Sequence, residues 1–81
     1  MSERFAFHAT TPKRLARYRA TGAILPPVRF FGFEARARQW GGKTQRLVLL
    51  RFPWPEPTYP LPDHQPSAYF TPSLVRVWEV V

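Results

Sequence analysis

The chain has 81 residues and no cysteine, and its twelve lysine and arginine residues outnumber five acidic residues, giving a formal net charge of +7. This length predicts a single domain over residues 1–81, and the missing cysteine excludes disulfide bonds, thiolate metal sites and cysteine nucleophiles. Residues 1–5 lack the apolar segment of a signal peptide, and the longest apolar run, 47–50, is too short to span a bilayer. We therefore expect a cytoplasmic protein.

Residues 4–8 alternate between bulky apolar side chains and small or polar ones, a pattern typical of a half-buried strand. Phe5 and Phe7 would lie on one face of this strand, and Ala6 and His8 on the other. The first strand is therefore expected to end at a histidine.

A helix is expected directly after this strand, from about Pro12 to Ala20. Thr10 or Thr11 can accept a hydrogen bond from the first turn, and Pro12 suits the first helical position because its missing N–H has no partner there. Gly22 is typical of the residue that ends a helix.

The middle of the chain predicts a short strand, a short helix and a central strand. The short strand is expected at 28–31. A helix is expected over 33–40, where three apolar residues recur at spacings of four and three, and Gly41 and Gly42 would end it. A strand follows over 44–52, and its four consecutive aliphatic residues are typical of a strand covered on both faces.

The last thirty residues predict a long loop and two strands. Residues 53–66 hold six of the ten prolines and can form neither a helix nor an interior strand. Short strands are expected at 67–71 and 74–81. The predicted fold is α+β, a small mixed or antiparallel sheet of four to five strands with two short helices.

The residues that could carry catalysis are scattered. The five acidic residues form no close pair, and the two histidines stand 56 positions apart, so no metal site is predicted. The three serines lack the glycine elbow that exposes a nucleophile. The sequence therefore leaves open whether the protein is an enzyme.

His8 is the strongest candidate for a binding residue because it lies at the end of a strand and at the start of a helix. Ligands tend to bind at such a junction, and the free N–H groups of the helix favour a phosphate or ribose nearby. A neutral imidazole can form a hydrogen bond with a sugar hydroxyl. The alternative is a structural histidine bonded to its own loop.

Several stretches together resemble the ADP-ribosyltransferase-type fold. These are the strand end and helix start at 7–11, the glycine-containing segment 22–26, the aromatic pair 30–31, the alanine-rich helix 34–38 and the closing segment 69–79. Families of this fold often begin with a strand ending in His-x-Thr, followed by a helix and a glycine.

This resemblance implies a split sheet that clasps a dinucleotide such as NAD. His8 would contact the adenine-side ribose and Thr10 would support it. Phe30 or Phe31 would stack on the nicotinamide. The segment 65–70 has no glutamate where the third motif of the transferases usually has one. The resemblance therefore implies nucleotide binding near His8 and leaves transferase activity open.

The positive charge predicts a different function, a non-catalytic RNA- or DNA-binding module. Cations would hold phosphates while aromatic side chains stack under bases. The expected contacts come from residues on the two helices, namely Lys13, Arg14, Arg17, Arg36 and Arg38.

A third hypothesis is a protein-interaction domain, in which the proline-rich loop 53–66 binds a partner through Trp54 and Tyr59. A homodimer also remains open, because it would supplement the thin core of so short a chain. The identity of the ligand, the oligomeric state and the pathway do not follow from the sequence.

Overall fold

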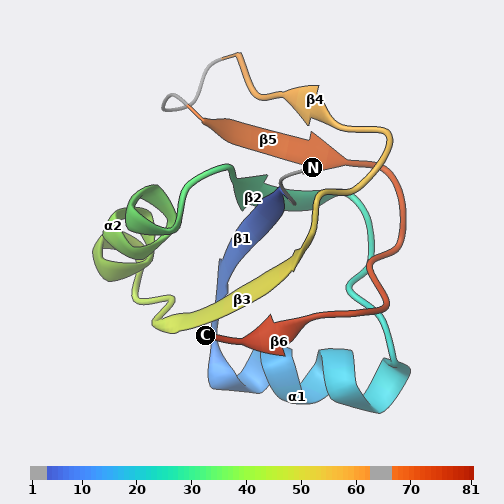
Figure 1. Ribbon diagram of the computed structural model, residues 1–81. Coiled ribbons are helices and arrows are strands. Elements are labelled where there is room, and N and C mark those ends of the chain that lie inside the picture. Colours follow the sequence, from blue (N-terminus) through green and yellow to red (C-terminus); the bar gives the residue numbers. More distant parts are fainter. Residues whose placement is uncertain (1–3, 63–66) are drawn as a thin grey trace.

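The structure is a computed structural model that describes residues 4–62 and 67–81. Two helices accompany one antiparallel sheet whose strand order is β4-β5-β2-β1-β3-β6 (Figure 1). The elements in chain order are β1 (Phe5–Thr10), α1 (Pro12–Thr21), β2 (Val28–Phe31), α2 (Glu34–Thr44), β3 (Val48–Pro53), β4 (Tyr59–Pro60), β5 (Ala68–Thr71) and β6 (Glu79–Val80). The expected α+β class, two helices and antiparallel pairing are confirmed, but the described residues form six strands instead of four or five.

Each face of the sheet carries its own apolar cluster, because side chains alternate along the strands. On β1, Ala6 belongs to the cluster that Leu15 of α1 covers. The next residue, Phe7, packs against the opposite cluster, which Ala37 of α2 covers. The predicted central strand behaves in the same way, with neighbouring leucines of β3 in different clusters. The two helices therefore lie on opposite faces of the sheet (Figure 1).

Helix α1 begins and ends as its sequence predicts. The Thr11 hydroxyl accepts a hydrogen bond from the Arg14 N–H at 3.2 Å, and Pro12 occupies the first helical position. Gly22 adopts the left-handed conformation with φ 77°, and its N–H donates to the Tyr18 carbonyl at 2.8 Å. The helix is one residue longer than expected.

Helix α2 does not end at Gly41 and Gly42, contrary to the prediction. It continues to Thr44, and the left-handed residue is Gln45, with φ 61°. The reason is a close contact in which the Arg46 N–H donates to the Gly41 carbonyl at 2.9 Å. A side chain at Gly41 would collide with the Arg46 backbone carbonyl, so the glycine is needed inside the helix. β3 consequently starts at Val48 instead of residue 44.

The expected strand over 74–81 is also wrong for most of its length, since only Glu79–Val80 joins the sheet. Val75 instead exchanges backbone hydrogen bonds with Ile24 in the connection that follows α1, at 2.8 and 3.2 Å. The proline-rich stretch contains the short strand β4 at the edge of the sheet, where proline is tolerated. Residues 63–66 of the predicted loop, with His64, lie outside the described residues. Within the described ranges no helix has the length and apolarity to cross a membrane.

Candidate functional site

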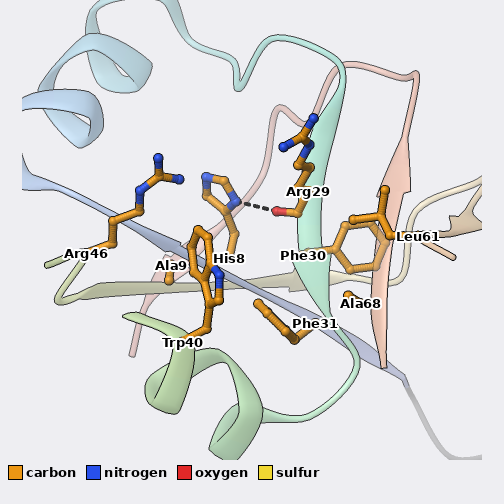
Figure 2. Close-up of a pocket in the computed structure, with 9 residues that line it drawn as sticks. All are labelled: His8, Ala9, Arg29, Phe30, Phe31, Trp40, Arg46, Leu61 and Ala68. Carbon is orange, nitrogen blue, oxygen red and sulfur yellow. Dashed lines mark hydrogen bonds between the residues drawn. The ribbon is translucent and has the colours of Figure 1, made fainter. Parts of the chain in front are cut away.

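The sheet opens between β1 and β2, beside His8. These strands share one register pair, Phe7 with Phe31, whereas β1 and β3 are paired at six positions. Continued antiparallel pairing would bring His8 opposite Phe30, but instead the His8 side chain spans the opening. Its Nδ1 lies 2.6 Å from the Arg29 carbonyl oxygen (Figure 2). The imidazole therefore makes a hydrogen bond where the backbone ladder is interrupted.

The hydrogen bonds of His8 define its protonation. A carbonyl oxygen can only accept, so Nδ1 carries the proton and donates to Arg29. Burial lowers the pKa of His8 below its usual 6.5, the hydrogen bond to Arg29 opposes this, and the charges of Arg46 and Arg14 lower the pKa further. At neutral pH the ring is uncharged, and Nε2 accepts from the Tyr18 hydroxyl at 3.2 Å.

Tyr18 connects His8 to Thr10. Its hydroxyl oxygen lies 3.4 Å from the Thr10 Oγ1, and its ring packs edge-on against Trp78. Thr10 is only 1% exposed and does not line the cavity beside His8. Thr10 therefore supports His8 through Tyr18 and has no direct route to a ligand in that cavity.

The opening beside His8 leads into a cavity of about 120 Å³, which we call the ring pocket. A cavity of about 150 Å³ holds a benzene molecule, while sites for drug-sized ligands begin near 300 Å³. The ring pocket is therefore the size of one aromatic ring. Its lining residues are His8, Ala9, Arg29, Phe30, Phe31, Trp40, Arg46, Leu61 and Ala68.

Figure 2 shows Arg29 and Arg46 on either side of His8, with Trp40 across from it. The Arg46 guanidinium lies 4.9 Å from the centre of a Trp40 ring, within the range of a cation–π contact. No carboxylate lines the ring pocket among residues 4–62 and 67–81. The pocket therefore combines an aromatic wall with uncompensated positive charge.

Phe30 and Phe31, the expected stacking residues, both line the ring pocket but are only 1% and 8% exposed. Phe30 is packed among the rings of Phe52, Trp54 and Tyr69. Phe31 packs against Trp40. Because Trp40 is half-buried, it is the more accessible aromatic wall of the pocket.

The structure separates the basic residues expected to bind nucleic acid. Arg14 and Arg17 line a second cavity of about 200 Å³. The charge of Arg14 also lowers the pKa of His8. Arg38 forms an ion pair with Glu34 at 2.9 Å. Lys13 and Arg36 are exposed and line neither cavity.

Sequence reasoning missed Arg29 and the polar role of Tyr18. Arg29 is the one polar residue of β2, which was a usable signal, because a charge within a short apolar strand must reach solvent or a ligand. Tyr18 gave no such signal, because an aromatic residue within a short helix is as typical of packing as of a polar contact. Its contact with His8 depends on how α1 packs on the sheet, which no local pattern reveals.

The aromatic residues proposed as protein-binding anchors differ in exposure. Trp54 is half-buried, and the Arg4 guanidinium lies 3.6 Å from the centre of its ring. Tyr59 lies on the edge strand β4, is 48% exposed and packs against Phe70. Only Tyr59 of this pair is therefore accessible to a partner without rearrangement.

The part of the chain that the structure describes contains no group of three or more histidine, cysteine or acidic side chains that could hold a metal ion. Comparison of the chain with family models, with curated proteins and with solved structures finds no match.

Proposed function

We propose that this protein binds a nucleotide, such as NAD or ADP-ribose, with one ring of the ligand in the ring pocket and its phosphates on the neighbouring arginines. The observation that carries this proposal is the opening between β1 and β2, where a cavity the size of one ring has an aromatic wall and two arginines at its sides.

His8 and Tyr18 supply the polar group that would meet the sugar of the ligand. The Tyr18 hydroxyl has two acceptors within reach, the His8 Nε2 and the Thr10 Oγ1. When the hydroxyl donates to Thr10, Nε2 is left as an acceptor for a sugar hydroxyl. His8 thus binds as a neutral acceptor, while its Nδ1–H stays on Arg29.

Arginine is suited to phosphate because its planar guanidinium offers paired N–H donors and keeps its charge. The Arg29 side chain is exposed although its carbonyl is bonded to His8, so the guanidinium is available for a ligand. The resemblance of the sequence to ADP-ribosyltransferase-type proteins favours NAD or ADP-ribose as the ligand. Glu79 is paired with Arg51 and does not line the pocket, so the proposal is limited to binding.

Thermal denaturation with nicotinamide, AMP, ADP-ribose and NAD tests this function. Saturation at about 100 times the dissociation constant adds about 2.7 kcal/mol to the free energy of unfolding, which raises Tm by about 10 °C or more in a domain of this size. We expect Arg29→Gln to weaken binding of ADP-ribose and AMP by about tenfold without affecting binding of nicotinamide, because only a charge-assisted hydrogen bond to phosphate is lost.

The matched control is Arg19→Gln, which removes an exposed arginine of α1 that lines neither cavity. This variant should bind like the original protein. The proposal fails if none of the four compounds changes Tm at millimolar concentration, or if Arg19→Gln and Arg29→Gln weaken binding equally.

A further inference from the structure

The second cavity is linked to the ring pocket by one side-chain contact. It is lined by Arg14, Arg17 and Tyr18 of α1, and by Thr21, Ala23 and Leu25 at the end of that helix. Tyr18 lines this cavity, and its hydroxyl reaches the Nε2 of His8, a residue that lines the ring pocket. The hydrogen bond between His8 and Tyr18 therefore joins one lining residue of each cavity.

A line of arginines follows both cavities, and we call Arg17, Arg14, Arg29 and Arg46 the arginine track. Arg17 and Arg14 lie three residues apart on α1 and thus on one helix face. The charges of Arg14, in the second cavity, and Arg46, in the ring pocket, both lower the pKa of His8. Within residues 4–62 and 67–81 no carboxylate forms an ion pair with any member of the track. The track therefore carries four positive charges that no carboxylate of the described residues pairs with.

The walls of the second cavity are partly apolar, since Leu25 is 65% exposed and Ala23 lies beside it. A cation beside an apolar surface recurs here as it does in the ring pocket. Proteins that bind single-stranded nucleic acid combine cations along the backbone with aromatic side chains under successive bases, and Tyr18 is the aromatic residue that lines the second cavity. A duplex does not fit the ring pocket, because its bases are paired and stacked.

We infer that the nucleotide bound in the ring pocket is one unit of a single-stranded nucleic acid whose backbone follows the arginine track, so that the adjoining nucleotide lies in the cavity beside Leu25. This inference rests on the proposed nucleotide-binding function. It extends the ligand from one nucleotide to a strand that occupies both cavities.

Fluorescence anisotropy with labelled oligoadenylate and oligouridylate RNA of about ten nucleotides tests the inference, with AMP and UMP as single-nucleotide competitors. Four phosphate contacts predict that affinity falls about fiftyfold between about 50 and about 200 mM NaCl, since each contact on a single strand contributes about −0.7 to the logarithmic salt slope. Arg17→Gln should reduce this salt-dependent loss of affinity to about twentyfold. It should also weaken binding of the oligonucleotide, while AMP binding stays unchanged.

Arg19→Gln is again the matched control, being on the same helix but outside both cavities. An oligonucleotide that binds no tighter than AMP, or that is unaffected by Arg17→Gln, overturns the inference and leaves the proposed function standing. An abasic oligonucleotide that binds as tightly as the complete one overturns both, because the ring pocket would then contribute nothing.

Two further probes separate a strand from other polyanions. A duplex of the same length and polyglutamate should each bind at least tenfold more weakly than the single strand, and equal binding by either overturns the inference. Trp40→Leu should weaken binding of the oligonucleotide and of AMP alike by about tenfold, because the aromatic wall is lost. If that variant does not fold, Trp40→Phe keeps a smaller ring and should weaken both by a few-fold, and unchanged binding counts against the inference.

Discussion

At the residue scale, His8 holds two strands together and also lines the ring pocket. Its Nδ1–H donates to the Arg29 carbonyl across the opening between β1 and β2, and its Nε2 accepts from Tyr18. The same ring forms part of the wall of the ring pocket. Replacement of His8 should therefore change the free energy of unfolding as well as the affinity for the proposed ligand, and a variant at Arg29 separates the two effects better.

The lowered pKa of His8 predicts that acid destabilises the protein below about pH 6.5. Burial disfavours the imidazolium, as do the charges of Arg46 and Arg14, so the unfolded chain binds more protons than the folded chain once the pH falls below the unfolded pKa. The free energy of unfolding should decrease from pH 6.5 toward the folded pKa, with a slope of at most about 1.4 kcal/mol per pH unit. Urea denaturation between about pH 7.5 and 5 measures this, because carboxylates stay largely ionised there.

The control for this measurement is the other histidine. His8→Gln should remove the pH dependence in this window, while His64→Gln should keep it. A pH dependence that survives His8→Gln and disappears in His64→Gln would show that His8 is not its source.

At the scale of elements, the end of α2 depends on one glycine. The Gly41 carbonyl accepts from the Arg46 N–H, and a side chain on Gly41 would collide with the Arg46 carbonyl. The adjacent Gly42 has no atom near the position of a Cβ. Two neighbouring glycines of one helix therefore have different surroundings. Because Gly41 permits the close contact with the Arg46 backbone, it also helps to position Arg46, which lines the ring pocket.

Gly41→Ala and Gly42→Ala should change stability in opposite directions. The first forces the Arg46 backbone away and should lower the free energy of unfolding by about 1–3 kcal/mol, as overpacking does. The second reduces the entropy of the unfolded chain and should raise it by about 0.5–1 kcal/mol. Urea denaturation of both variants measures the difference, and a change of the same sign in both would contradict the assigned contact.

Elements with local signals could be predicted from the sequence. The start of α1 at Pro12 and its end before Gly22 depend on caps within the helix itself, and both were predicted. The end of α2 and the reduction of the last strand to Glu79–Val80 depend on tertiary contacts. These contacts, of Gly41 with Arg46 and of Val75 with Ile24, join segments whose proximity no periodicity shows.

The candidate site was predictable to the same extent. Alternation correctly indicated that His8 belongs to a strand, but the expected end of that strand at His8 was wrong, because β1 stays paired with β3 as far as Thr10. The partners of His8 could not be predicted, because the Arg29 carbonyl reaches His8 only where β1 and β2 cease to pair, and Tyr18 reaches it only through helix packing. The sequence thus indicated which residue lies at the site but not what holds it there.

At the scale of the whole molecule, the net charge of +7 is spread over a body of 30 × 28 × 25 Å. At about 10 mM salt the Debye length is about 30 Å, so every charge interacts with every other, whereas at 0.15 M the length of about 8 Å limits interactions to close neighbours. Only two ion pairs, Arg38 with Glu34 and Arg51 with Glu79, join described residues. Repulsion therefore outweighs attraction at low salt.

The melting temperature should consequently rise between about 10 and about 150 mM NaCl, by about 4–8 °C if screening adds about 1 kcal/mol to the free energy of unfolding. Lys13→Gln with Arg36→Gln provides the sharpest comparison, because both cations stand in the first turn of a helix, where positive charge is unfavourable. This double variant should have a higher melting temperature than the original protein at low salt. Its melting temperature should also rise less as NaCl is added. A melting temperature that falls as NaCl increases would mean that the two ion pairs outweigh the repulsion and would contradict this account.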